Sequence, residues 1–172
     1  MSQSPPLFES VIKQYSPLLF RVASTYEANT SIQQELFQEI CVSIWLALKT
    51  YKGEASVKTF ILKVAHNRCV THIGKEVGRF KSHEAADAAS LADQSLFSEK
   101  LSLENEIERS QKVQQLLNAI RRLKLPARQV ISLSLEGLRY EDISEICGIS
   151  VSNVGVTIKR VKEQLRNEID HE

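Results

Sequence analysis

The chain has 172 residues, of which 42% are hydrophobic and 25% are charged, values that are ordinary for a folded globular protein. They argue against global disorder, and no apolar run approaches the roughly 18 residues that cross a bilayer, so we expect a cytoplasmic location. The formal net charge of +1 conceals three blocks, because residues 1–82 carry +4, residues 83–108 carry −6 and residues 109–172 carry +3.

Apolar residues recur at helical spacing throughout, and strand signals are nearly absent, so we expect an all-α fold. The first helix is predicted from about residue 7 to residue 26. The second is predicted over about 31–50, with Ser31 and Gln34 as its capping box. The apolar positions of the second helix that we expect to be buried are Leu36, Ile40, Ile44, Trp45 and Leu48.

A third helix is predicted over about 57–75, with Ser56 able to cap its first turn. Its inward positions are predicted to be Val57, Phe60, Ile61 and Val64. Residues 49–81, which include this helix, carry eight Lys or Arg against two Glu. Such a stretch is either a solvated helix face or a surface for a polyanion, and the charge alone favours neither.

The composition changes over residues 83–108, where small and acidic residues replace the apolar stripe. We expect this segment to be a flexible acidic linker between two small helical domains, residues 1–82 and residues 109–172. Helical periodicity resumes in the second domain, and Pro126 suits the first turn of a new helix.

The segment from Tyr140 to Ile169 has the helix, glycine turn and helix of a helix-turn-helix motif. Gly148 permits the turn, and Ser150 can cap the second helix. The residues predicted to point inward are Ile143, Cys147, Ile149, Val151, Val154, Ile158, Val161 and Leu165. The candidate DNA face on the other side contains Ser152, Asn153, Val156, Lys159, Arg160 and Glu163. Any two amphipathic helices joined by a glycine share part of this pattern, but the spacing and the cap together favour DNA binding.

Two blocks of the sequence resemble sigma factors of bacterial RNA polymerase, in that family's order. The block LPARQVISLSLEGLRYEDISEICGISVSNVGVTIKRVKEQLR is similar to sigma domain four, which binds the minus-thirty-five promoter element and the polymerase beta flap. The block ELFQEICVSIWLALKTYKGEASVKTFILKVAHNRCVTHIGK is similar to sigma domain two, which grips the beta-prime clamp helices and melts the minus-ten element. Because only an acidic linker separates them, the resemblance is to the extracytoplasmic-function (ECF) type.

The resemblance implies three groups of binding residues. The group for core polymerase is Glu35, Leu36, Gln38 and Glu39. The minus-ten group is Lys58, Thr59, Phe60, Lys63, Asn67 and Arg68. The minus-thirty-five group is Ser152, Asn153, Val156, Thr157, Lys159 and Arg160. A basic helix with an aromatic ring and amides suits an unstacked strand, although Phe60 also fits the core stripe of its helix.

The chain departs from the family pattern at several positions. A frequent tryptophan, an acid and an arginine pair are replaced by Phe60, Thr71, Gly74 and Lys75. Arg139 stands where a serine or threonine usually caps the first helix of the motif. In the recognition helix a common basic pattern is replaced by Gly-Val-Thr at residues 155–157, so base reading there would depend more on apolar contact.

The resemblance also implies the partners of the chain. These are core RNA polymerase, promoter DNA and an anti-sigma factor, which is often membrane-bound in the family, with no cofactor and no small-molecule substrate. The alternative is a helix-turn-helix regulator that acts without polymerase, but the first domain offers no ligand pocket, phosphoacceptor or dimerisation helix. An enzyme is not expected, because no phosphate loop, nucleophile elbow or other catalytic constellation occurs.

Three residues at three-residue intervals, His66, Cys69 and His72, raise the question of a metal site. No matching pair elsewhere completes a zinc set, so we expect no metal and imidazoles that lie at the surface. The three cysteines are far apart and surrounded by apolar residues, which favours buried free thiols over a disulfide framework.

Overall fold

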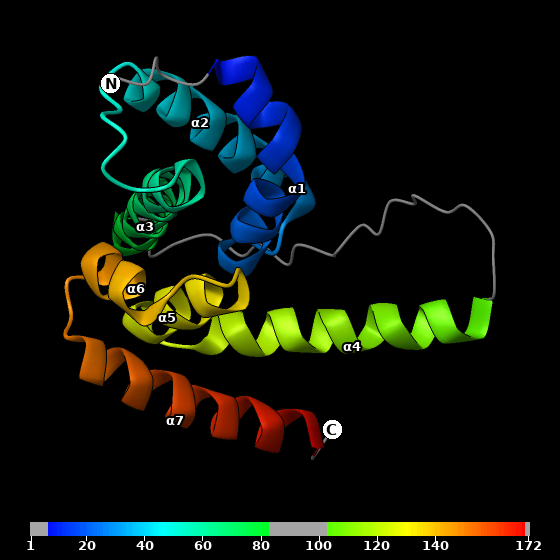
Figure 1. The fold of residues 1–172 in the computed structure, drawn as a ribbon. Coiled ribbons are helices and arrows are strands. Elements are labelled where there is room, and N and C mark those ends of the chain that lie inside the picture. Colours follow the sequence, from blue (N-terminus) through cyan, green and yellow to red (C-terminus); the bar gives the residue numbers. More distant parts are fainter. Residues whose placement is uncertain (1–6, 83–102, 171–172) are drawn as a thin grey trace.

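A computed structural model of the chain describes residues 7–82 and 103–170, with side chains described over 7–78 and 110–169. Every regular element in these ranges is a helix, which confirms the all-α prediction (Figure 1). The seven helices are α1 (Phe8–Tyr26), α2 (Thr30–Leu48), α3 (Val57–Ser82), α4 (Leu103–Arg122), α5 (Leu125–Leu135), α6 (Tyr140–Cys147) and α7 (Val151–Asp170).

The first three helices pack against one another, each burying one apolar face. The largest fully buried side chains of this unit are Leu19, Leu36, Ile40, Ile44, Ile61 and Leu62. Asn29 caps α2, because its Oδ1 accepts a hydrogen bond from the Ser31 amide at 3.0 Å, so the predicted capping box of Ser31 and Gln34 is wrong. Ser56 caps α3 as predicted, since its Oγ accepts a hydrogen bond from the Thr59 amide at 3.1 Å.

Three predictions for these helices need correction. Trp45 is 48% exposed, because it follows buried Ile44 by one residue and so lies about 100° around the helix from the buried stripe. Helix α3 continues to Ser82, well beyond the predicted end near residue 75. Of the positions predicted to point inward from α3, Ile61 is fully buried, whereas Val57, Phe60 and Val64 are half-buried.

The remaining helices form a second unit around the predicted helix-turn-helix. Pro126 lies in the first turn of α5 as expected, and Gly148 ends α6 with a φ of 66°, a left-handed conformation that glycine adopts without strain. Ser150 caps α7, because its Oγ accepts a hydrogen bond from the Asn153 amide at 3.2 Å. The predicted inward stripe of α7 is buried except for Val151, which is 41% exposed at the first position of the helix.

The segment predicted as a linker, residues 83–108, is only partly described. Helix α4 begins at Leu103, inside that segment, and residues 83–102 lie outside the described residues. The two units that flank the segment are in direct contact through the packing of α5 against α1 and α3 and of α4 against α1 (Figure 1). Val130, Leu133 and Ile143 of the second unit belong to the same buried cluster as the core of the first.

Candidate nucleic-acid and polymerase interfaces

The recognition helix α7 has two chemically different faces. Val154, Ile158, Val161 and Leu165 are buried against the rest of the second unit. The residues predicted to face DNA are Ser152, Asn153, Val156, Lys159 and Arg160, all exposed, and Thr157, which is half-buried. Thr157 Oγ1 donates a hydrogen bond to Asn153 Oδ1 at 3.4 Å, which leaves the Asn153 NH₂ group as a free donor toward solvent. This face can therefore offer amide, hydroxyl and apolar groups to base edges and cations to phosphates.

Four of the six predicted minus-ten residues of α3 line a cleft of about 500 Å³, and Lys58 and Arg68 lie outside its lining. Thr59, Phe60, Lys63 and Asn67 contribute to its wall. The ring of Phe60 packs on that of Tyr51, with centroids 4.9 Å apart and planes inclined by 57°. The Tyr51 hydroxyl donates a hydrogen bond to the Ala55 carbonyl at 2.6 Å, which fixes the loop that precedes α3. Aromatic rings, an amide and a cation thus converge on one opening.

Two lysines of the minus-ten group contact carboxylate-bearing residues of the second unit, which the sequence did not reveal. Lys63 Nζ lies 3.2 Å from Glu145 Oε1, and Lys58 Nζ donates a hydrogen bond to the Glu136 carbonyl at 2.5 Å. The Glu136 carboxylate accepts two hydrogen bonds from the Arg21 guanidinium, at 3.0 and 2.8 Å, and these bonds raise the pKa of Arg21. No local sequence signal predicts these pairs, because each joins residues about 80 or more positions apart.

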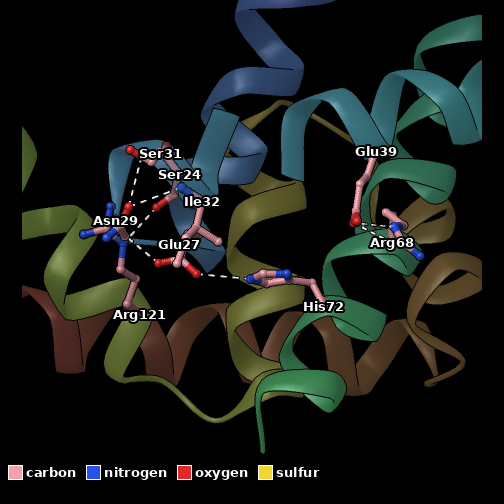
Figure 2. A network of polar contacts seen from close by, with 9 residues as sticks. All are labelled: Ser24, Glu27, Asn29, Ser31, Ile32, Glu39, Arg68, His72 and Arg121. Atoms are coloured by element: carbon pink, nitrogen blue, oxygen red, sulfur yellow. Dashed lines mark hydrogen bonds and ion pairs between the residues drawn. The ribbon is translucent and has the colours of Figure 1, made fainter. Parts of the chain in front are cut away.

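The structure also joins a predicted polymerase contact to a predicted DNA contact. The Arg68 guanidinium binds Glu39 Oε2, with nitrogen–oxygen distances of 2.9 and 2.5 Å (Figure 2). The Arg68 side chain is only 24% exposed and the Glu39 side chain 47%. Each residue therefore also has a structural role, which is to hold α2 and α3 together at this edge.

The outer face of α2 contains three of the four residues predicted for core polymerase. Glu35, Gln38 and Glu39 are exposed, whereas Leu36 is 1% exposed and belongs to the hydrophobic core. Leu36 is thus not available on this surface. Further along the helix, the exposed apolar residues are Val42, Trp45 and Leu46, at 57%, 48% and 51% exposure.

Sequence reasoning missed the apolar half of this α2 face, although a signal was present. Val42 lies seven residues after Glu35, and Trp45 lies seven residues after Gln38, so two helical turns separate each pair on one side of α2. Lys49 Nζ sits 3.9 Å above the centre of the Trp45 ring and covers part of it with a cation–π contact.

The histidines differ from the expected surface imidazoles. His66 is fully buried, with Nδ1 2.7 Å from the Tyr26 hydroxyl and Nε2 without a hydrogen-bond partner, and burial lowers its pKa to about 3. His72 Nε2 lies 3.1 Å from Glu27 Oε2, and its side chain is only 12% exposed (Figure 2). The hydrogen bond to Tyr26 and the pairing with Glu27 are what allow these polar rings to be buried.

The thiols follow the prediction in part. Cys69 is fully buried, which raises its pKa, whereas Cys41 and Cys147 are half-buried free thiols. Within the described ranges, no group of three or more His, Cys, Asp or Glu is placed to hold a metal ion. Of the helices described, none combines the length and apolar character needed to span a bilayer.

Comparison with known proteins identifies the two units. The family model Sigma-70 region 2 matches residues 11–78, and Sigma-70, region 4 matches residues 113–165. The ECF RNA polymerase sigma-E factor of Haemophilus influenzae is 25% identical over 166 residues, covering 94% of this chain and 87% of that protein. The RNA polymerase sigma factor YlaC of Bacillus subtilis is 23% identical over 162 residues, covering 94% of this chain and 91% of that protein.

Two solved structures share the fold. The sigma factor RpoE from Bartonella quintana, solved with the anti-sigma factor NepR, has a TM-score of 0.74 at 18% identity and covers 95% of this chain and 96% of its own. CnrH, solved with the cytosolic domain of CnrY, has a TM-score of 0.66 at 15% identity and covers 96% and 88%.

Regions 2 and 4 occur here in order, span most of the chain and contain the helix-turn-helix described above, so the chain belongs to the sigma-70 family of transcription initiation factors. Such factors direct RNA polymerase to promoters. The curated relatives align over 94% of this chain, and only residues 79–112 separate the two matched regions, so the protein is a sigma factor of the ECF type.

Proposed function

We propose that this sigma factor uses three separate surfaces: the outer face of α2 for core polymerase, the α3 cleft for the minus-ten element, and the exposed face of α7 for the minus-thirty-five element. On this proposal, residues 1–82 form sigma domain two and residues 109–172 form sigma domain four. The chain contributes binding rather than catalysis and acts in the cytoplasm, where it meets RNA polymerase.

The observation that carries the proposal is the division of α7 into a buried stripe and an exposed polar face. The first turns of a recognition helix enter the major groove, and here they present Ser152, Asn153 and Val156. Val156 is 53% exposed, so its methyl groups are accessible for contact with the methyl group of a thymine. Lys159 and Arg160 follow one turn later, where contact with phosphates is expected.

The α3 cleft has the groups that hold an unpaired strand. The rings of Tyr51 and Phe60, packed against each other at an angle, offer an aromatic surface to a base. Asn67 is exposed and lines the same cleft, and Lys63 can bind a phosphate. The excess of positive charge over residues 49–81 attracts DNA to this side of the molecule.

The outer face of α2 suits a protein partner. Val42, Trp45 and Leu46 form an exposed apolar group, and Glu35 and Gln38 give it a polar edge. Protein interfaces typically combine an apolar or aromatic centre with a polar rim. An anti-sigma factor is a further partner that we propose, because two proteins of the same fold were solved with partners, one of them an anti-sigma factor by description.

The test is binding to bacterial core RNA polymerase and transcription from random-sequence templates, with start sites read by sequencing. Val42→Asp should weaken core binding by roughly tenfold or more, because it places a charge at the centre of the interface. Val77→Asp is the matched control, since Val77 of α3 is 50% exposed and lies outside the proposed surface.

We prefer Val42 to Glu39 for this test because changing Glu39 would also remove the partner of Arg68. Equal core binding by the Val42→Asp and Val77→Asp variants would refute the assignment of the α2 face. DNA binding by the parent without any core binding would instead indicate a regulator that acts without polymerase.

A further inference from the structure

The first two turns of the recognition helix contain no charged side chain. Residues 151–158 read VSNVGVTI, and the first cation of α7 is Lys159. The polar side chains of these two turns are Ser152, Asn153 and Thr157. Hydrogen bonding to base edges in these turns therefore depends on two hydroxyls and one amide.

Hydroxyls and amides differ in the bases that they can distinguish. A hydroxyl rotates about its C–O bond and serves as donor or as acceptor, so it accommodates bases of either kind. An amide has a donor on one side and an acceptor on the other, so it distinguishes bases when its orientation is fixed. A free amide turns over by 180° between two similar positions and loses this distinction. The orientation of the Asn153 amide thus decides the base preference of these turns.

The structure fixes Asn153 at its backbone and at its side chain. The backbone amide of Asn153 donates a hydrogen bond at 3.2 Å to Ser150 Oγ, the cap of α7. One turn along the helix, the Thr157 hydroxyl donates a hydrogen bond to Asn153 Oδ1 at 3.4 Å. Residues four apart are neighbours on a helix surface, so this contact needs no other element. Thr157 is half-buried and Asn153 is exposed, so a partly enclosed hydroxyl orients an amide that DNA can reach.

The neighbouring positions add apolar surface rather than charge. Gly155 has no side chain, and the edge of the Tyr140 ring lies 3.4 Å from the position that a Cβ would occupy there. Val156 is 53% exposed. A base edge that enters this surface without finding a partner at Asn153 loses hydration and gains no hydrogen bond in return, which is unfavourable. The apolar surroundings therefore strengthen the discrimination that the amide provides.

We propose that Thr157 is a positioning residue: its hydroxyl holds the Asn153 oxygen along the helix, so the NH₂ group faces the major groove and selects a base with a hydrogen-bond acceptor. Guanine, adenine and thymine each present an acceptor in the major groove, whereas cytosine presents only its amino donor there. Cytosine is therefore the base that this helix excludes at the position that Asn153 contacts. The inference rests on the proposed minus-thirty-five role of α7.

The test uses RNA polymerase assembled from core enzyme and the full chain, on a promoter selected from random-sequence templates. Competition binding gives the relative affinities for promoters that carry each of the four bases at every position of the minus-thirty-five element. Asn153→Ala identifies the position that Asn153 contacts, because the base preference should fall there. At that position the parent should bind the cytosine promoter roughly tenfold more weakly than the best one, the usual effect of one unsatisfied hydrogen-bonding group.

Thr157→Val keeps the shape of the side chain and removes the hydroxyl, so the Asn153 amide can turn over and accept a hydrogen bond from cytosine. The discrimination against cytosine should fall by roughly two- to tenfold, which corresponds to one neutral hydrogen bond. Thr157→Ser retains the hydroxyl and should restore the discrimination of the parent. Thr71→Val is the matched control, because Thr71 is an exposed helical threonine of domain two whose hydroxyl also bonds one turn away, to the Asn67 carbonyl. It should leave the minus-thirty-five preferences unchanged.

Adding Thr157→Val to Asn153→Ala should change the discrimination no further, because a positioning residue acts only through the amide. Full discrimination by Thr157→Val alone would overturn the inference, and so would an equal loss of affinity for all four bases, which a purely structural role would cause. A parent chain that tolerates or prefers cytosine at that position would also refute it. If Asn153→Ala changes the preference at no position, the assignment of α7 to the minus-thirty-five element fails, and the inference fails with it.

Discussion

Burial of His66 predicts a specific pH dependence of the stability of domain two. The ring is fully buried, with Nδ1 hydrogen-bonded to the Tyr26 hydroxyl, and burial lowers the pKa of His66 from 6.5 to about 3. The unfolded chain therefore binds a proton as the pH falls below 6.5, while the folded chain does not. The neutral His66 therefore contributes its full stabilisation above pH 6.5, and this contribution is lost as the pH falls from 6.5 toward 3. Below pH 3 it changes little.

The size of the effect follows from the two pKa values. Each pH unit between them costs about 1.4 kcal/mol of unfolding free energy, so lowering the pH from 7 to 5 should cost about 2 kcal/mol through His66 alone. The assay is urea unfolding at both pH values, followed by the fluorescence of Trp45, the only tryptophan of the chain and a residue of domain two.

The control is His66→Gln, whose side-chain oxygen can still accept a hydrogen bond from the Tyr26 hydroxyl but which does not titrate. Other groups titrate equally in both proteins, so the difference between their pH dependences isolates His66. The variant should lose about 2 kcal/mol less than the parent between pH 7 and pH 5. Equal losses would show that His66 is accessible to protons in the folded chain, and would refute the burial argument.

Two further predictions concern domain four. Asn153→Ala should lower the binding free energy on the best minus-thirty-five site by about 1 to 3 kcal/mol and reduce the base preference at one or two positions of that site. Arg160→Ala should weaken binding to all minus-thirty-five sequences about equally and should reduce the slope of log affinity against log salt concentration by about one. Binding titrations of single-base variants of the DNA site at several salt concentrations distinguish these outcomes. If Arg160→Ala changed the base preference and Asn153→Ala changed only the salt dependence, α7 would lie in the groove in the opposite orientation. Gly148→Ala should destabilise the domain by about 1 kcal/mol in thermal unfolding followed by circular dichroism, because φ is 66° there; an unchanged midpoint would contradict it.

The sequence predicted most of what is local in this fold. The turn at Gly148, the cap at Ser150 and the exposed face of α7 depend on residues within a few positions of one another, so spacing was enough to place them. Trp45 was misplaced because residue type was weighted above position, although the helical period puts it outside the stripe that ends at Leu48.

The contacts of α3 could not be predicted from its own sequence. His66 was assigned to the surface as a polar residue, and only its partner Tyr26, 40 positions away, makes burial possible. The inward stripe was misjudged for a related reason, since α3 packs against α1, α2 and α5 and so has no single buried side. The pairing of Lys63 with Glu145 is likewise a property of the tertiary arrangement. The charge of residues 49–81 indicated only a solvated helix face or a surface for a polyanion, and it did not identify Glu145 as a partner.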